Sequence, residues 1–139
     1  GYAMGQGVDE LNKAGYVAEG YDFSETAIKT AKEMYPEYGF THEWPNKTYD
    51  VVISSNCFEH FTNPLEWLEK VLTLSNKYVV IMTPYNQIPH EVHPITITEN
   101  SFPQKFNGFK MLAIKLVPSK EAFYDGGDQI MFIYEKEAL

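Results

Sequence analysis

Residues 15–36, "GYVAEGYDFSETAIKTAKEMYP", join a predicted strand to a predicted helix. The apolar and aromatic run over residues 16–21 predicts the strand. From Ser24 onward apolar residues recur at helical spacing, and Ser24 is of a type that caps helix N-termini. The predicted helix ends at Pro36, and one acid, Asp22, lies at the turn between strand and helix. A strand followed directly by a helix is the building unit of α/β folds.

The flanking segments continue this alternation. A glycine-rich opening precedes a predicted helix over residues 8–14, and Gly15 is its expected stop. Downstream, the patterns predict a short strand over 38–41, a fully buried strand over 50–55, a helix from Pro64 to near Ser75 and a buried strand over 77–82. This order predicts an α/β fold in which helices cover a parallel sheet.

The last third of the chain changes character. Residues 83–97 contain prolines and histidines and predict a loop, and residues 99–106 predict a short helix interrupted by Pro103. Two longer apolar runs follow, over residues 109–117 and 129–135. The segment between them carries glycines and charges, so the two runs predict a closing β-hairpin.

Composition limits the possible functions. The chain has 139 residues, 11 basic and 19 acidic side chains and a net charge of −8, so we expect a single domain over residues 1–139 that binds neither nucleic acid nor membrane. Cys57 is its one cysteine, no Cys/His cluster has zinc spacing and no metal is expected. The absence of a signal segment and of a long apolar run favours a cytoplasmic, soluble protein. Oligomeric state is left open.

Glycines and one acid have the spacing of a nucleotide site. Gly1, Ala3 and Gly5 would let the backbone approach a ligand, and Asp22 would accept hydrogen bonds from both hydroxyls of a ribose. The alternative is that the glycines belong to a flexible end and that Asp22 only stabilises a helix N-terminus.

Three segments together carry a family resemblance: residues 19–36, residues 49–71 ("YDVVISSNCFEHFTNPLEWLEKV") and residues 77–86 ("KYVVIMTPYN"). They resemble class I S-adenosylmethionine (SAM)-dependent methyltransferases of the small-molecule type. The resemblance implies a three-layer Rossmann-like sheet, mostly parallel with a C-terminal antiparallel hairpin. It also implies SAM as the cofactor and a small-molecule acceptor, which the sequence does not identify.

The resemblance assigns roles to individual residues. It implies that Asp22 binds the ribose diol of SAM and that Phe23 lies against the adenine. It places Asn56, Cys57 and His60 at the methionine end and the methyl-transfer face of the cofactor. The alternatives are ordinary packing for Phe23 and Cys57 and a turn-capping role for His60.

The sequence departs from the family at two points. Gly1, Ala3 and Gly5 fall on the family's Gly-x-Gly-x-Gly loop with alanine at the middle position, and the family's first, central strand is absent, so we expect an N-terminally shortened chain. Loss of a central strand costs roughly 1–3 kcal/mol for each buried backbone group left unsatisfied. The usual acid for the adenine amine is also missing, and the candidate substitutes are Thr41, His42 and Glu43.

A general base is needed only if the acceptor loses a proton. The candidates are His60 and His93, with His90 in the same loop as His93, and Tyr85 and Trp44 are candidates for the acceptor-pocket wall. The alternative is a solvated loop with two incidental histidines.

Two other functions compete with methyl transfer. The first is a non-catalytic or incomplete methyltransferase-like binding domain. The second is a nicotinamide-dinucleotide enzyme that uses Gly5, Gly7 and Asp22, although the third glycine of that fingerprint is missing.

Overall fold

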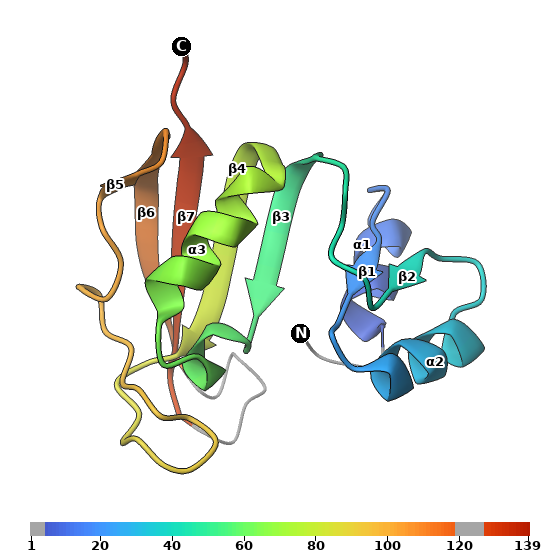
Figure 1. The fold of residues 1–139 in the computed structure, drawn as a ribbon, viewed down its shortest axis with the longest axis horizontal. Coiled ribbons are helices and arrows are strands. Elements are labelled where there is room, and N and C mark those ends of the chain that lie inside the picture. Colours follow the sequence, from blue (N-terminus) through green and yellow to red (C-terminus); the bar gives the residue numbers. More distant parts are fainter. Residues whose placement is uncertain (1–4, 119–126) are drawn as a thin grey trace. The chain divides into compact units, whose positions relative to one another are not determined.

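A computed structural model describes residues 5–118 and 127–139. The chain divides into two compact units, Gly1–Asn46 (unit 1) and Lys47–Leu139 (unit 2) (Figure 1). The single domain over residues 1–139 stays a prediction. Gly1 and Ala3 lie outside the described residues.

Unit 1 holds the strand and helix of the opening motif. Its elements are α1 (Gln6–Lys13), β1 (Gly20–Tyr21), α2 (Glu25–Met34) and β2 (Phe40–Thr41). The two strands pair in parallel, and the Ser24 hydroxyl accepts a hydrogen bond from the Ala27 N–H at 3.3 Å, as its predicted capping role requires. The strand predicted over residues 16–21 is confirmed only at its last two residues.

The core of unit 1 depends on two glycines. Ile28 and Ala31 from α2 pack with Phe40 from β2. A Cβ atom at Gly20 would lie 2.6 Å from the Phe40 ring, and one at Gly5 would lie 2.8 Å from it. Gly5 also has a positive φ of 76°, so it combines a close approach with a left-handed backbone.

Unit 2 is a five-stranded mixed sheet (Figure 1). Its elements are β3 (Tyr49–Ser55), the 3₁₀ turn η1 (Phe58–His60), α3 (Pro64–Thr73), β4 (Ser75–Pro84), β5 (Lys105–Phe106), β6 (Phe109–Val117) and β7 (Gln129–Lys136). The strand order is β3-β4-β7-β6-β5. Only β3 and β4 pair in parallel within it, so the α/β class is confirmed and the description "mostly parallel" is matched in part.

The end of the chain forms the predicted hairpin of β6 and β7, which pair antiparallel. Strand β5 was not predicted. It reaches β6 through Asn107 and Gly108, which have φ values of 46° and 80°, a combination that suits a tight two-residue hairpin turn. The helix predicted over residues 99–106 is wrong, because turns precede β5 there.

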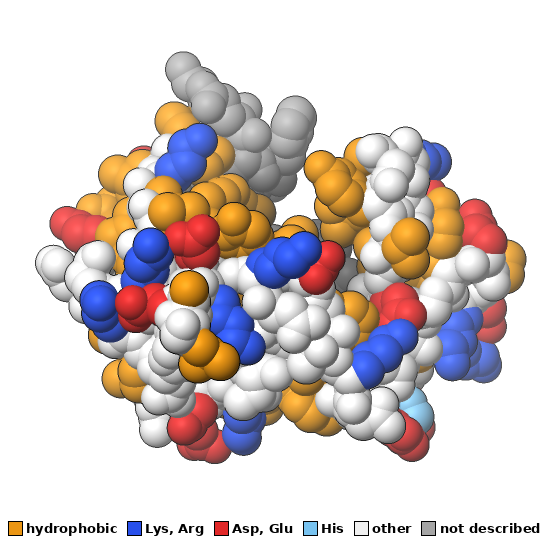
Figure 2. Space-filling view, turned by 90° about the horizontal axis from the view of Figure 1, so that it is seen from above, with side chains coloured by type: hydrophobic (Ala, Val, Ile, Leu, Met, Phe, Trp, Pro, Cys, Tyr) orange, Lys and Arg blue, Asp and Glu red, His pale blue; other side chains and the backbone are white. Residues whose placement is uncertain are grey.

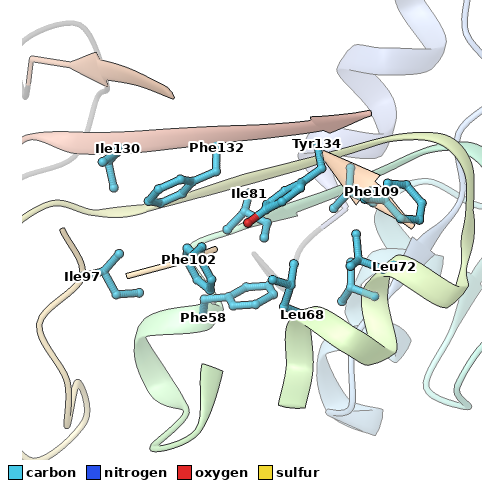
Figure 3. Packing of buried hydrophobic residues seen from close by; sticks show 12 residues of the cluster. Phe58, Leu68, Leu72, Ile81, Ile97, Phe102, Phe109, Ile130, Phe132 and Tyr134 are labelled. Carbon is cyan, nitrogen blue, oxygen red and sulfur yellow. The ribbon is translucent and has the colours of Figure 1, made fainter. Parts of the chain in front are cut away.

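The core of unit 2 lies between α3 and one face of the sheet (Figure 3). Leu68 and Leu72 from α3 belong to the same buried cluster as Phe132 and Tyr134 from β7, and Phe58 from η1 is part of it. The Tyr134 hydroxyl donates a hydrogen bond to a backbone carbonyl, that of Pro103, at 2.6 Å. Burial raises the pKa of this phenol above its usual value. A neutral tyrosine therefore forms part of the core.

Strand β3 is an edge strand of the described sheet of unit 2. Val52 packs against the core, but Val51 and Ile53, which alternate with it, are 45% and 51% exposed. The prediction that residues 50–55 are fully buried is therefore wrong for one of the two strand faces.

The surface mixes residue types. On the face shown in Figure 2, acidic and basic side chains lie beside one another and hydrophobic ones reach the surface of both units. Within the described ranges, none of the helices is long and apolar enough to cross a membrane.

Candidate active site

The candidate site begins with the residues that follow β3. Because β3 and β4 run parallel, their carboxyl ends lie at the same edge of the sheet, where ligands of α/β folds bind. Asn56 follows β3 with a positive φ of 49°, and its N–H donates to the Met82 carbonyl at 2.8 Å. Asparagine tolerates this left-handed conformation better than most residues. The chain thus leaves β3 through a sharp, hydrogen-bonded turn.

The 3₁₀ turn η1 carries a buried acid. Phe58 is 1% exposed and anchors η1 in the core, and the next residue, Glu59, is 3% exposed. The Thr83 hydroxyl, at the end of β4, donates to Glu59 Oε2 at 2.9 Å. A carboxylate is thereby held at the sheet edge by a hydroxyl from the neighbouring strand.

His60 points toward the loop after β4. Its Nδ1 lies 2.7 Å from the Val92 carbonyl, which can only accept, so Nδ1 carries the proton. The second nitrogen, Nε2, is then the unprotonated one in the neutral ring, and it lies 4.0 Å from Glu59 Oε1. The side chain is 47% exposed, so this side of the cluster is open to solvent.

His93 lies beside His60, with 4.7 Å between the ring centroids. Its Nδ1 is 2.6 Å from Gln87 Oε1, and this bond also leaves Nε2 as the free nitrogen of the neutral ring. Burial lowers the pKa of the His93 imidazole; the Glu59 carboxylate opposes this shift, and the His60 and His90 imidazoles add to it. His93 is therefore held neutral under ordinary conditions.

The loop over residues 85–99 is fixed at both of its ends. The Tyr85 N–H donates to the Asp128 carbonyl and the Asn86 N–H to the Ile97 carbonyl, both at 2.8 Å. The Tyr85 hydroxyl donates to Glu99 Oε2 at 3.0 Å, and this bond raises the pKa of the phenol. His90 and His93 pair through backbone hydrogen bonds within this loop. The two histidines therefore belong to an ordered loop with its own turn.

One polar atom of the site is buried and unpaired. Within the described part of the chain, Asn56 Oδ1 has no hydrogen-bond partner. A buried acceptor without a donor is unfavourable by about 1–3 kcal/mol. An amino group, such as the one at the methionine end of SAM, is a donor of the kind that this atom lacks. The neighbouring Cys57 is a free, partly exposed thiol.

Unit 1 holds the other predicted cofactor residues. Asp22 is 7% exposed, and its Oδ1 accepts a hydrogen bond from the Ser24 N–H at 2.9 Å. This bond is the local turn expected of an acid at a helix start, and it fixes the direction of the carboxylate. Phe23 is 76% exposed and Gly5 precedes α1. The cofactor-binding roles of Gly5, Asp22 and Phe23 stay predictions.

The other aromatic and adenine candidates have local partners. Trp44 meets the Tyr21 ring edge to face at 5.3 Å. The Thr41 hydroxyl accepts from the Glu43 N–H at 3.1 Å, and His42 Nε2 lies 3.8 Å from a Glu25 oxygen. These contacts show local packing and pairing in unit 1, and their predicted roles at adenine or acceptor stay untested.

Sequence reasoning missed three residues that shape the site in unit 2. They are Glu59, Thr83 and Gln87. Glu59 lies close to His60 and His93, the Thr83 hydroxyl donates to Glu59, and Gln87 accepts a hydrogen bond from His93. A glutamate four residues after the end of an apolar strand, next to a histidine, was a usable signal for the first of them.

The comparisons define the class of protein. A family model for a methyltransferase domain matches residues 1–114, and the chain therefore belongs to this methyltransferase family. The match confirms the predicted class, the SAM-dependent methyltransferases, and with it SAM as the cofactor of that class. A search of curated proteins found no match.

Solved structures agree with this fold. Magnesium protoporphyrin IX methyltransferase (ChlM) from Synechocystis PCC 6803 with bound SAM has a TM-score of 0.72 and 15% identity, with 92% of this chain and 63% of that chain covered. The plantazolicin methyltransferase BpumL, in complex with a pentazolic desmethylPZN analog and SAH, has a TM-score of 0.67 and 18% identity, with 97% of this chain and 74% of that chain covered. The chain thus spans less than two thirds of the ChlM chain.

A third structure separates fold from reaction. The [4+2]-cyclase SpnF has a TM-score of 0.75 and 8% identity, with 98% of this chain and 72% of that chain covered. Identities this low show the fold alone. Because SpnF is described as a cyclase, the same fold also occurs in a protein that is not described as a methyltransferase. The fold by itself therefore does not define the reaction of this chain.

Proposed function

We propose that residues 1–139 act as one SAM-dependent methyltransferase domain whose acceptor is a small molecule. The observation that carries the proposal is the methyltransferase-domain match over residues 1–114. The buried, unpaired Asn56 Oδ1 at the carboxyl edge of the sheet supports it, because this acceptor suits the amino group of the cofactor. No partner of the nucleic-acid or membrane class is proposed, since the net charge is −8.

Each predicted cofactor residue would have its own role. Asp22 would accept the ribose hydroxyls, since its direction is already set by the Ser24 N–H, and the exposed Phe23 ring would lie on the adenine. Gly5 would belong to the loop at the cofactor, together with Gly1 and Ala3. Asn56 and Cys57 would line the methionine end.

The chemistry asks little of the protein beyond orientation. Bound SAM supplies an activated methyl group on a sulfonium. Holding the acceptor in line with that group contributes roughly 7–11 kcal/mol toward lowering the barrier. The ordered loop over residues 85–99 would form part of the surface that positions the acceptor.

A proton has to leave when the acceptor is an alcohol or a phenol. In the neutral form of each ring, the hydrogen bonds of His60 to the Val92 carbonyl and of His93 to Gln87 Oε1 keep the proton on Nδ1 and leave Nε2 as the acceptor. The lowered pKa of His93 keeps that ring neutral and able to accept. Either imidazole can therefore serve as the base.

Cofactor binding tests the proposal. Isothermal titration with SAM and with its demethylated product SAH is carried out on the native protein, including any residues encoded before Gly1. We expect binding, and we expect Asp22→Asn to weaken it by about tenfold to a hundredfold, the worth of a hydrogen bond to a charged group. The control is Asp50→Asn, a 67% exposed carboxylate, which should bind like the parent.

The reaction itself needs a second measurement. Transfer of isotopically labelled methyl from SAM into a small-molecule extract should depend on the protein. Failure of both SAM and SAH to bind would refute the proposed methyltransferase function. Binding of SAM without protein-dependent transfer would instead support the alternative, a non-catalytic methyltransferase-like domain.

A further inference from the structure

We propose that Glu59, His60 and His93 form a binding site for a divalent transition-metal ion. Each of the three offers one ligand atom, and these atoms all lie within 4.8 Å of one another. All three residues belong to unit 2. The site therefore involves neither unit 1 nor SAM.

The three ligand atoms are free because other atoms of the same side chains make the supporting hydrogen bonds. His60 Nδ1 donates to the Val92 carbonyl and His93 Nδ1 to Gln87 Oε1, which leaves both Nε2 atoms available. Metal-binding histidines nearly always donate their other N–H to a carbonyl or carboxylate, because this bond fixes the ring. Here the supporting bonds are present around all the donors.

The carboxylate follows the same pattern. Glu59 Oε2 accepts from the Thr83 hydroxyl at 2.9 Å, so Oε1 is the oxygen that faces His60 Nε2, at 4.0 Å. Glu59 is 3% exposed, and burying a carboxylate is costly unless it is paired. Within the described part of the chain its partners are the Thr83 hydroxyl and the His60 and His93 imidazoles, none of which carries a charge when the rings are neutral. A bound cation would supply the missing positive charge.

Two imidazoles and one carboxylate define the class of metal. This donor set suits Zn²⁺, Fe²⁺ or Co²⁺ and is too nitrogen-rich for Mg²⁺ or Ca²⁺, which prefer oxygen. In a tetrahedral zinc site the ligand atoms are about 3.4 Å apart, given metal–ligand distances of about 2.1 Å. The cluster would therefore tighten by roughly 1 Å on binding, and the half-exposed His60 ring has room to move.

The site would remain open on one side. Three protein ligands leave at least one position for water or for an oxygen of a bound molecule, and the exposed side of His60 gives solvent a route to it. A metal ion and a proton compete for the same Nε2 atoms. In the metal-bound protein, a metal-bound oxygen of lowered pKa would thus take the place of a free histidine base.

Metal titration of the purified, chelator-treated protein tests the proposal. We expect one Zn²⁺ per chain by isothermal titration and a Co²⁺ complex with visible absorption. In nuclear magnetic resonance spectra the Nε2 resonances of His60 and His93 should shift on addition of Zn²⁺, while their Nδ1 atoms stay protonated. Absence of stoichiometric Zn²⁺ and Co²⁺ binding would overturn the proposal.

Variants locate the metal. His60→Gln, His93→Gln and Glu59→Gln should each abolish stoichiometric binding, and Gln87→Leu, which removes only a supporting bond, should weaken it about 10- to 100-fold. His60 is half exposed, so His60→Gln should keep the fold even if a buried variant does not. Circular dichroism shows whether each variant is folded.

The matched control is His42→Gln. His42 is 46% exposed, close to the exposure of His60, and its Nε2 also lies near a glutamate, 3.8 Å from Glu25 Oε1, but no second histidine completes a described cluster there. This variant should bind Zn²⁺ like the parent. If His42→Gln lost the metal while folded His60→Gln kept it, the assignment would be wrong.

Discussion

Thr83 Oγ1 lies 2.9 Å from Glu59 Oε2, and both side chains are almost completely buried. The two residues are 24 positions apart in the sequence and come from η1 and from the end of β4. Their hydrogen bond ties the turn after β3 to the neighbouring strand. It therefore links the stability of unit 2 to the geometry of the candidate site.

Thr83→Val tests this link. Valine keeps the shape of threonine but leaves the buried Glu59 carboxylate without its hydroxyl donor, so we expect a loss of about 1–3 kcal/mol in the free energy of unfolding. Urea denaturation followed by near-ultraviolet circular dichroism measures it. Thr73→Val is the control, because the Thr73 hydroxyl is exposed and donates to the Lys70 carbonyl within α3. Equal stability of the two variants would contradict the structural role of this bond.

Gly20→Ala should destabilise unit 1. The added Cβ would lie 2.6 Å from the Phe40 ring, so the buried ring would have to move, at a cost of about 1–3 kcal/mol. Gly7→Ala is the matched control: nothing lies within 4 Å of a Cβ at this position in α1, and alanine should stabilise the helix by roughly 0.5–1 kcal/mol. The midpoint temperature of thermal denaturation should therefore fall for Gly20→Ala and rise for Gly7→Ala.

Leu68→Ala should create a cavity in unit 2. Leu68 is completely buried between α3 and the sheet, and such truncations cost about 2–5 kcal/mol. Leu65→Ala, one turn earlier on the same helix, removes a side chain that is 40% exposed, so its cost should be clearly smaller. Chemical denaturation of the two variants gives the comparison, and a cost for Leu65→Ala as large as that for Leu68→Ala would dispute the packing.

Tyr134 should make the protein sensitive to alkali. Burial raises the pKa of its phenol, whereas a tyrosine in an unfolded chain ionises near pH 10. Its contribution is therefore fully present below about pH 10 and is lost above it, by about 1.4 kcal/mol per pH unit.

Tyr134→Phe separates this effect from simple packing. The variant loses the hydrogen bond to the Pro103 carbonyl, which costs roughly 1 kcal/mol at neutral pH. Its stability should nevertheless fall less steeply above pH 10, as measured by urea denaturation between pH 8 and pH 11. Parallel pH profiles of the two proteins would rule out the proposed role of the phenol.

Local sequence patterns predicted most elements well. The helix begun by Ser24 and the hairpin of β6 and β7 follow from capping and from apolar runs, which depend only on neighbouring residues. Strand β5 was missed because it has two residues and depends on the tight turn at Asn107 and Gly108. Partial exposure of Val51 and Ile53 was missed because a run of apolar residues does not reveal whether both strand faces are covered.

Sequence alone determined the α/β class, the Asp22 turn and the resemblance that the methyltransferase-domain match confirmed, because these rest on contiguous motifs. Only the tertiary structure brought His93 to Glu59 and His60, which are more than 30 positions away. Parallel pairing of β3 and β4 places the segments that follow them at one edge of the sheet. The spacing of these residues along the chain does not reveal their proximity, because strand pairing and the path of the loop after β4 bring their ligand atoms together.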